Sequence, residues 1–246
     1  MKLLLLMAAI GVFAGQNGNA QEYEKDIIPT SGGALEITFL GHATMMLQFN
    51  GTVIHVDPVS AEADYANLPK AGLILVTHDH GDHFDPKAIT QVYTDKTAMV
   101  WTATCAEKAG AQFKGQVMKN GDTATVQGIP IEAVPAYNIQ HLRSPGNPYH
   151  PKGIGNGYVL TFGDTRVYIA GDTENTPELK ALKSIAVAFL PVNLPYTMDV
   201  DMAADAALSI RPRILYPYHY GETDLAPLVK LLAEEKGIEI RIRKME

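Results

Sequence analysis

The sequence is poor in the side chains that covalent catalysis uses. Cys105 is the only cysteine among 246 residues, so the chain offers neither a pair for an intrachain disulfide nor a cluster of thiolates for a metal. It lies near Ala103 and Ala106, and we interpret it as a small buried side chain. The G-x-S-x-G turn is missing, and no serine stands in a pattern with a partner base. A serine or cysteine nucleophile is therefore not expected.

Positive charge is also scarce. The chain has 20 lysines and arginines against 27 aspartates and glutamates, a net charge of −7, which disfavours a nucleic-acid surface or docking on anionic lipid. No linker rich in proline, glycine or serine, no charge run and no low-complexity tract divides the sequence. With 46% hydrophobic residues, it is long enough for one sizeable domain with its own core.

The longest apolar run is at the N-terminus and is too short to span a bilayer. It follows Lys2 and continues to about Ala14, and Gly18-Asn19-Ala20 supplies the small residues that a signal peptidase accepts. We therefore predict that residues 1–20 are a signal peptide, leaving an exported protein, periplasmic or secreted, with no stable membrane insertion. An uncleaved anchor or a buried N-terminal helix is the alternative. Residues 21–33 are expected to be an extended or loose lead-in, and residues 34–246 the folded domain.

Strand and helix patterns alternate through that domain. Asn50-Gly51 predicts a hairpin turn, and Asp85-Pro86 and Thr176-Pro177 combine a helix cap with a first-turn proline. Because strands and helices are mixed throughout, two sheets covered by helices are expected. Apolar patterning predicts strands at 35–40, 45–49, 52–56, 73–76, 98–102, 129–135, 158–162, 166–170, 187–191, 214–218 and 238–242, and helices at 201–210 and 224–236.

The densest group of chemically active residues is Thr77-His78-Asp79-His80-Gly81-Asp82-His83. It follows the apolar run 73–76, which reads as a buried strand. In extended backbone, residues two apart share a side, so His78 and His80 can reach one metal ion while Asp82 and His83 turn toward a second. Imidazole and carboxylate are ligands that zinc, manganese, iron or nickel accept. A polar loop that is merely rich in histidine is the alternative.

The same order of a strand followed by a ligand recurs twice. Asp172 follows the strand 166–170, and His219 follows the strand 214–218. Taken alone, the local sequence would indicate that Asp172 caps a turn and that His219 is an ordinary core histidine. Beside the H-x-H-x-D-H stretch, both become candidate metal ligands.

From about Leu35 to the C-terminus, the chain resembles the metallo-β-lactamase superfamily, whose motif is this H-x-H-x-D-H stretch. The resemblance implies an α/β fold, a four-layer αββα sandwich with the site along one edge. It also implies two divalent metal ions, zinc first, with manganese or iron as alternatives. Metal one would take His78, His80 and Asp172. Metal two would take Asp82, His83, Asp172 and His219.

One ligand of the family pattern is displaced. Asn138 stands after the strand 131–136, where the family usually has a histidine that completes metal one. We favour His150 as its replacement over His141, although Asn138 could itself be a weak ligand through its carbonyl oxygen. A subset of family members shows the same A-Y-N followed by H-P-K-G, so the departure does not mean decay. If nothing replaces the histidine, the first metal would bind weakly or the site would hold a single ion.

Two further residues match family motifs around the metal loop. Asp57, in Val56-Asp57-Pro58, resembles a buried aspartate that supports the ligand histidines. His42, in Gly41-His42-Ala43-Thr44, matches a G-H-A motif of the branch that includes ascorbate-phosphate lactonases and N-acyl-phosphatidylethanolamine phospholipase D. We assign His42 a supporting role around the metals and, with Asp82, count it as a candidate catalytic residue.

These features predict a hydrolase with a dinuclear metal site, in which Asp82 ligates and orients a hydroxide that attacks an ester, lactone, amide or phosphodiester bond of a small molecule. The resemblance leaves two alternatives. One is a di-iron redox protein of the same fold, which the lack of a flavodoxin-like partner domain disfavours. The other is a non-catalytic metal-binding protein. The sequence carries no signal for oligomeric state.

Overall fold

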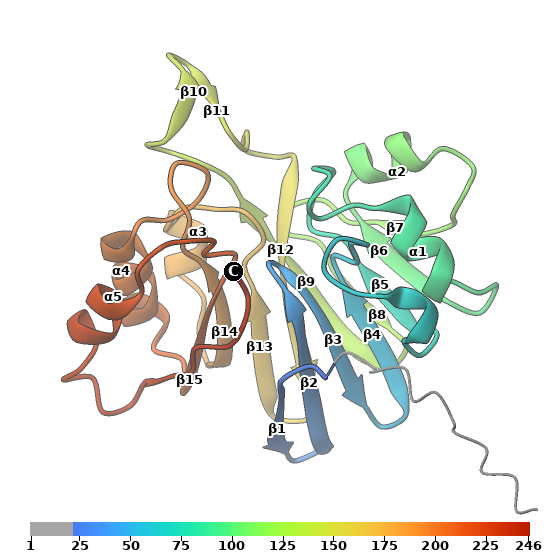
Figure 1. Cartoon of the computed structure of the whole chain (residues 1–246), viewed down its shortest axis with the longest axis horizontal. Helices are drawn as coiled ribbons and strands as arrows, with labels where there is room; N and C mark the ends of the chain where they lie inside the picture. Colours follow the sequence, from blue (N-terminus) through green and yellow to red (C-terminus); the bar gives the residue numbers. More distant parts are fainter. Residues whose placement is uncertain (1–21) are drawn as a thin grey trace, which may run out of the picture.

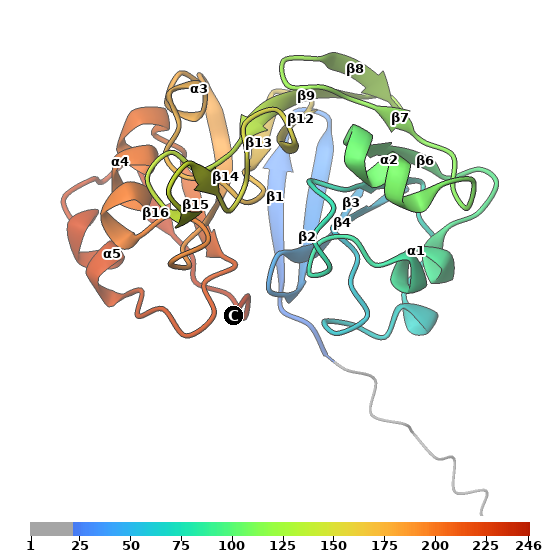
Figure 2. The ribbon, with the colours of Figure 1, turned by 90° about the horizontal axis from the view of Figure 1, so that it is seen from above.

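The computed structural model describes residues 22–246, which form two seven-stranded sheets packed face to face with helices outside (Figures 1 and 2). The predicted signal peptide lies outside the described residues. Between residues 22 and 246, no helix is both long and apolar enough to cross a membrane.

The first sheet keeps the order of the chain. Its first four strands are antiparallel neighbours, and its later strands are parallel. Helices α1 (Pro86–Val92) and α2 (Ala103–Ala109) lie against its outer face (Figure 2). The strands are β1 (Lys25–Thr30), β2 (Gly33–Gly41), β3 (Thr44–Phe49), β4 (Thr52–Val56), β5 (Leu73–Leu75), β6 (Ala98–Trp101) and β7 (Gln116–Val117).

The second sheet mirrors the first. Its strands run β16-β15-β14-β13-β12-β9-β8, of which β13 to β16 are parallel. Helices α3 (Pro177–Lys180), α4 (Val200–Ile210) and α5 (Ala226–Leu231) belong to this half. The strands are β8 (Thr123–Val126), β9 (Ile129–Ala136), β12 (Gly155–Phe162), β13 (Thr165–Ile169), β14 (Ile185–Pro191), β15 (Ile214–Tyr218) and β16 (Glu239–Ile240).

The strand that leads into the histidine-rich turn is buried on both faces. Leu73 and Leu75 of β5 face the core between the sheets, whereas Ile74 and the following Val76 face a second core under α1 and α2. This explains why the segment reads as an unbroken apolar run rather than as an alternating one. It also fixes the strand firmly, so that the turn after it starts from a rigid point.

The two sheets are joined directly beside that turn. The backbone N–H of Asn156 in β12 donates to the carbonyl of Thr77 at 2.9 Å, and the hydroxyl of Tyr158 donates to the carbonyl of Val76 at 2.9 Å. Strands β5, β13 and β15 are parallel members of their sheets, and the candidate ligands follow their carboxyl ends. The fold prediction of two mixed sheets with flanking helices is confirmed.

Several local predictions were wrong. Residues 25–30 are extended, one of the two forms expected of the lead-in, but they pair with β2 as strand β1 and so belong to the folded sheet, which was not predicted. Helix α5 ends at Leu231 instead of reaching 236, because after Leu232 the segment exposes its side chains and has no apolar stripe left to bury. Strand β16 has two residues, fewer than the predicted 238–242. Helix α2, the short 3₁₀ turn Tyr65–Asn67, and the hairpin of β10 (Leu142–Ser144) and β11 (Asn147–Pro148) were not predicted.

Candidate metal centre

The turn after β5 brings its ligand atoms together through local hydrogen bonds. The backbone N–H groups of His83 and Phe84 both donate to the carbonyl of His80, which reverses the chain within a few residues. Asp85 then caps α1, as the sequence predicted. The side chains of His78 and His83 are buried, and His80 is half-buried.

The second sheet supplies Asp172 and His219 from the ends of two different strands. Asp172 follows Gly171, whose φ is +64° and where an added Cβ would lie 2.8 Å from the carbonyl oxygen of Asn156, so only glycine fits this approach. His219 follows β15, and its backbone N–H donates to the carbonyl of His42 at 3.0 Å. The topology therefore places residues that are distant in the chain at one edge.

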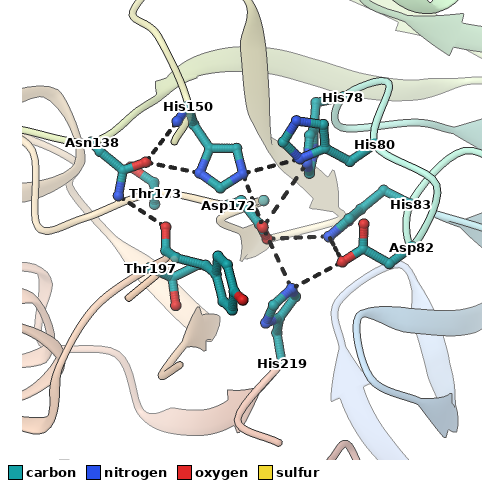
Figure 3. A network of polar contacts seen from close by, with 12 residues as sticks. His78, His80, Asp82, His83, Asn138, His150, Asp172, Thr173, Thr197 and His219 are labelled. Carbon is teal, nitrogen blue, oxygen red and sulfur yellow. Dashed lines mark hydrogen bonds and ion pairs between the residues drawn. The ribbon is translucent and has the colours of Figure 1, made fainter. Parts of the chain in front are cut away.

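Asp172 lies at the centre of the cluster (Figure 3). Its Oδ1 is 3.2 Å from Nε2 of His83, and its Oδ2 is 3.3 Å from Nε2 of His150 and 3.4 Å from Nε2 of His219. Three groups of side chains could each hold a cation, because the donor atoms within each group all lie within 4.8 Å of one another. The groups are His42, Asp82, His83 and His219; His78, His80 and His150; and His78, His83 and Asp172.

The donor atoms of this cluster fit a divalent cation. Within residues 22–246, Nε2 of His78 and Nε2 of His219 are buried without a hydrogen-bond partner. Buried polar atoms are normally paired, so these atoms point to a missing partner of positive charge. Neutral imidazole and carboxylate are donors that zinc and related ions accept.

The protonation states of two histidines suit a ligand role. Burial, reinforced by the neighbouring His83, holds the pKa of His78 well below its ordinary value. Burial likewise lowers the pKa of His150 to about 4. Both rings are therefore neutral near pH 7 and keep a lone pair for a metal.

Two groups at the centre carry charge. Burial opposes the charged form of Asp172, but His219 and His83 outweigh it and hold the pKa of this carboxyl well below its usual range. Burial also opposes the charged form of His83, yet Asp172 and Asp57 raise its pKa well above the ordinary value. In the metal-free protein a proton occupies His83, and a cation would have to displace it.

The ring of His150 points into the cluster because hydrogen bonds to Asn138 orient it. Oδ1 of Asn138 accepts hydrogen bonds from the backbone N–H and from Nδ1 of His150, both at 2.8 Å. Nε2 of His150 then lies 3.3 Å from Nδ1 of His80 and faces Asp172 (Figure 3). The carbonyl oxygen of Asn138 is therefore directed at His150, and His141 lies outside all three donor groups.

A buried carboxylate that sequence reasoning missed holds this loop. Glu174 is fully buried and accepts hydrogen bonds from three successive backbone N–H groups, those of residues 139–141, each at 2.7 Å. It also accepts from the ring of His141 and from the amide of Asn138. Glu174 stands two residues after Asp172, but nothing in the sequence marks it as a loop anchor.

Asp57 and Thr77 set the orientation of two ligand rings. The Oδ2 of Asp57 accepts from Nδ1 of His83 at 2.8 Å and from the hydroxyl of Thr77 at 2.7 Å. Because Thr77 gives its proton to Asp57, Nδ1 of His78, 3.1 Å away, must donate to that hydroxyl. Both rings therefore carry a proton on Nδ1 and turn Nε2 toward Asp172. Thr77 was not predicted to take part.

His42 lies on the exposed side of the centre, next to Asp82. Its Nε2 is 3.4 Å from Oδ2 of Asp82, and its ring stacks on that of His219 with 3.8 Å between centroids. Burial opposes the charged form of Asp82, but His219 and His42 hold its pKa far below the usual range. Three residues around the centre, His42, Asp57 and His219, have left-handed backbone with φ of 44–50°, which is uncommon outside glycine.

A cleft of about 470 Å³ opens over the cluster, so small molecules can reach it. Its walls include His42, Asp82 and Asp172 from the centre, together with Arg143 and Tyr196 from two loops. Sequence reasoning missed Arg143, because the β10–β11 hairpin that carries it has no apolar alternation.

Comparison with known proteins places the chain in a family. The model of the Beta-lactamase superfamily domain matches residues 36–219. The chain belongs to the metallo-β-lactamase superfamily. A UPF0173 metal-dependent hydrolase of Methanopyrus kandleri is 30% identical over 226 residues, which cover 86% of this chain and 97% of that protein. Membership of the UPF0173 metal-dependent hydrolase family follows.

Solved structures agree with this superfamily assignment. A crystal structure from Parabacteroides distasonis, described as a candidate metal-dependent hydrolase, is 50% identical, with a TM-score of 0.86 over 92% of this chain and 100% of its own. The metallo-β-lactamase fold protein YhfI of Bacillus subtilis shares only 13% identity, with a TM-score of 0.67 over 86% of this chain and 97% of its own, and shows the fold alone. The predicted class, a metal-dependent hydrolase of this fold, is confirmed for the family.

Proposed function

We propose that this member of the superfamily hydrolyses a small molecule with two divalent metal ions, most simply zinc, at an ester, lactone, amide or phosphodiester bond. The observation that carries the proposal is the central position of Asp172, which faces imidazole rings on both sides. These rings are either neutral or carry a proton that a metal ion can displace. A carboxylate with two free oxygens between two sets of nitrogen donors suits a bridge between two ions.

The proposed ligand sets follow the donor groups. His78, His80 and His150 with Asp172 would hold the first ion, and His150 takes the position that a histidine at residue 138 would otherwise fill. The second ion would be held by Asp82, His83 and His219, again with Asp172. Histidine nitrogen and carboxylate oxygen without thiolate favour zinc, with manganese or iron as competitors.

When bound, two such ions supply a water that is deprotonated near neutral pH and a Lewis acid for the bond under attack. The rest of the chemistry belongs to the chain. The exposed carboxylate of Asp82, which its low pKa keeps ionised, would accept a hydrogen bond from that water and orient it. His42, with Nε2 directed at Asp82 and lining the cleft, is placed to take the proton that the water gives up and to pass it to the leaving group.

The bond and the compartment are proposals that rest on motifs. The G-H-A motif around His42 favours a lactone or a phosphodiester, because it resembles the branch of ascorbate-phosphate lactonases and N-acyl-phosphatidylethanolamine phospholipase D. The apolar stretch up to about Ala14, followed by the small residues Gly18-Asn19-Ala20, supports export to the periplasm or medium. The net charge of −7 favours a small molecule rather than nucleic acid as the partner.

Elemental analysis of the purified full chain, combined with hydrolysis assays, tests the proposal. We expect about two ions per chain, as in dinuclear hydrolases, with turnover of a γ-lactone or of bis(p-nitrophenyl) phosphate that a chelator abolishes and zinc restores. Asp82→Ala should fold normally and lose turnover. Full activity in Asp82→Ala would contradict the assigned role. Bound metal without hydrolysis of any bond class would favour the metal-binding alternative, and iron without hydrolysis the redox one.

A further inference from the structure

We infer that Arg143, braced by Tyr149, forms a subsite for an anionic group of the substrate, a carboxylate or a phosphate, beside the metal centre. The inference deepens the proposed function and rests on it for the place where the bond is cleaved. The subsite would select substrates that carry an oxyanion separate from the scissile bond.

The cleft brings Arg143 and the centre together. Arg143 belongs to β10, in the hairpin that projects beyond the two sheets in Figure 1, and it lines the same cleft as His42, His150 and Asp172. Apart from Tyr196, the other charged or titratable side chains that line this cleft among the described residues belong to the metal cluster. Arg143 is therefore the one guanidinium or ammonium group facing the site in that part of the chain.

Arg143 also differs from most arginines of this chain. Of the six arginines, all within residues 22–246, four form ion pairs with nearby carboxylates: Arg166, Arg211, Arg241 and Arg243. Among the described residues, Arg143 and Arg213 have no such partner. In a protein with a net charge of −7, an arginine without a carboxylate partner on the wall of a cleft is available for an incoming anion.

Aromatic packing holds the guanidinium without using its hydrogen-bond donors. Its Cζ lies 5.1 Å from the ring centroid of Tyr149, which in turn contacts the ring of Tyr196 edge-on, with 5.1 Å between centroids and 81° between planes. A guanidinium over an aromatic face keeps all five N–H groups free, in a fork that matches the two oxygens of a carboxylate or phosphate.

The hairpin that carries Arg143 is fixed to the centre at its base. The backbone N–H of Asn138 donates to the carbonyl of His150 at 2.9 Å, and Glu174 binds the N–H groups of residues 139–141. Tyr149 directly precedes the proposed ligand His150. The position of the guanidinium is thereby tied to that of a metal ligand, which is what a selective subsite requires.

An exposed aromatic side chain beside the subsite indicates the rest of the substrate. Tyr196 lines the cleft and is 46% exposed. A ring or short apolar chain of the substrate would lie against it while the anionic group reaches Arg143. The substrate class is therefore an anionic molecule with an apolar or planar part next to its charged group.

Paired probes test the subsite. The zinc-loaded full chain is titrated calorimetrically with phenylacetate, with phenylphosphonate and with the neutral benzyl alcohol. We expect both anions or one of them to bind, and Arg143→Gln to weaken that binding about tenfold, the effect of losing a charged hydrogen bond. Arg143→Lys should be intermediate, because lysine keeps the charge without the fork. Arg213→Gln, the other arginine without a carboxylate partner, serves as the matched control and should bind as the native chain does.

Hydrolysis provides a second readout. For p-nitrophenyl propionate and mono-p-nitrophenyl succinate, which differ by a carboxylate, Arg143→Gln should lower the charged-to-neutral ratio of kcat/KM about tenfold, mainly through KM. Anion affinities equal in Arg143→Gln and the native chain would overturn the subsite, even if the ester assays succeed. Absence of metal-dependent hydrolysis in the native chain would contradict the proposed function, while the titrations would still decide the role of Arg143.

The titrations also distinguish the two anionic groups. If Arg143→Gln weakens the binding of phenylacetate more than that of phenylphosphonate, the subsite selects a carboxylate, and the reverse result identifies a phosphate.

Discussion

The two halves of the molecule supply the metal centre in different ways. The first half provides four candidate ligands from one turn of six residues, 78–83, oriented by Asp57 and Thr77 from the same sheet. The second half provides His150, Asp172 and His219 from three separate connections. His219 is held by His42, which is far away in the chain, and His150 is held by Asn138 across a twelve-residue loop.

Because of this difference, the geometry of the ligands in the first half depends on local structure, and that of the ligands in the second half depends on the whole fold. Ligands on one turn keep their mutual geometry whenever β5 and the start of α1 are formed. Ligands on three connections meet only when the whole second sheet is in register and packed against the first. We therefore expect changes in the second half to disturb the centre over longer distances, and the following experiments test that expectation.

The largest effect is expected from Asp172→Ala. Removing the central carboxylate leaves both donor sets incomplete, so the protein should lose both ions and more than about 100-fold in kcat/KM, beyond the loss that outer-shell changes cause. Asp82→Ala, in the first half, should lose comparable activity but retain one ion. Elemental analysis and circular dichroism of both variants check this. Equal metal content in the two would remove the asymmetry between the halves.

His150→Ala should lose one ion and about 100-fold or more in kcat/KM, because it removes a donor rather than an outer-shell partner. His141→Ala is the matched control from the same loop, since its ring binds Glu174 and belongs to none of the donor groups. It should keep both ions. Retention of two ions by His150→Ala would return Asn138 or His141 to the list of ligands.

The supporting residues of the two halves are compared by Asp57→Asn and Asn138→Ala. Each removes a hydrogen bond that orients a ligand ring, and each should cost about 10–100-fold in metal affinity. Competition with a chromophoric chelator measures this. Because Asn138 also ties the hairpin base, Asn138→Ala should additionally reduce anion binding at Arg143, whereas Asp57→Asn should not. Equal anion binding in both variants would show that the hairpin is fixed independently of Asn138.

The smallest effect on the centre is expected from His55→Gln. His55 is buried in β4 and donates from Nε2 to the carbonyl of Pro69, and burial lowers its pKa to about 4. In the unfolded chain the pKa of a histidine is about 6.5. Above that pH the ring is neutral in both states, and the contribution of His55 to stability is fully present. As the pH falls toward 4, the unfolded chain takes up a proton that the folded protein does not, so this stability is lost.

In urea titrations, the native chain should therefore lose up to about 3 kcal/mol more unfolding free energy than His55→Gln between pH 7 and pH 4. Metal content should be the same in both proteins at pH 7. Identical pH dependence would show that His55 takes up its proton as readily in the folded protein as in the unfolded chain, so that burial does not lower its pKa. The variant separates a histidine that is merely buried from those that hold metal.

The sequence predicted the local half of the centre better than the distributed half. The turn 78–83 could be recognised because its residues are contiguous and follow an apolar run. Asp172 and His219 needed the family pattern, since an aspartate after glycine and a buried histidine are common features of any fold. The partnership of Asn138 with His150 and the anchoring by Glu174 depend on how a twelve-residue loop closes, which no periodicity encodes.

The left-handed backbone at His42, Asp57 and His219 has a consequence for protein engineering. Each such residue costs about 1–3 kcal/mol that the rest of the fold must offset. Glycine at these positions would relieve that strain, and it would also delete side chains that build the centre. A directed search for heat-resistant variants of this chain, if it selects for solubility alone, should therefore drift toward glycine here and yield sturdier but inert proteins.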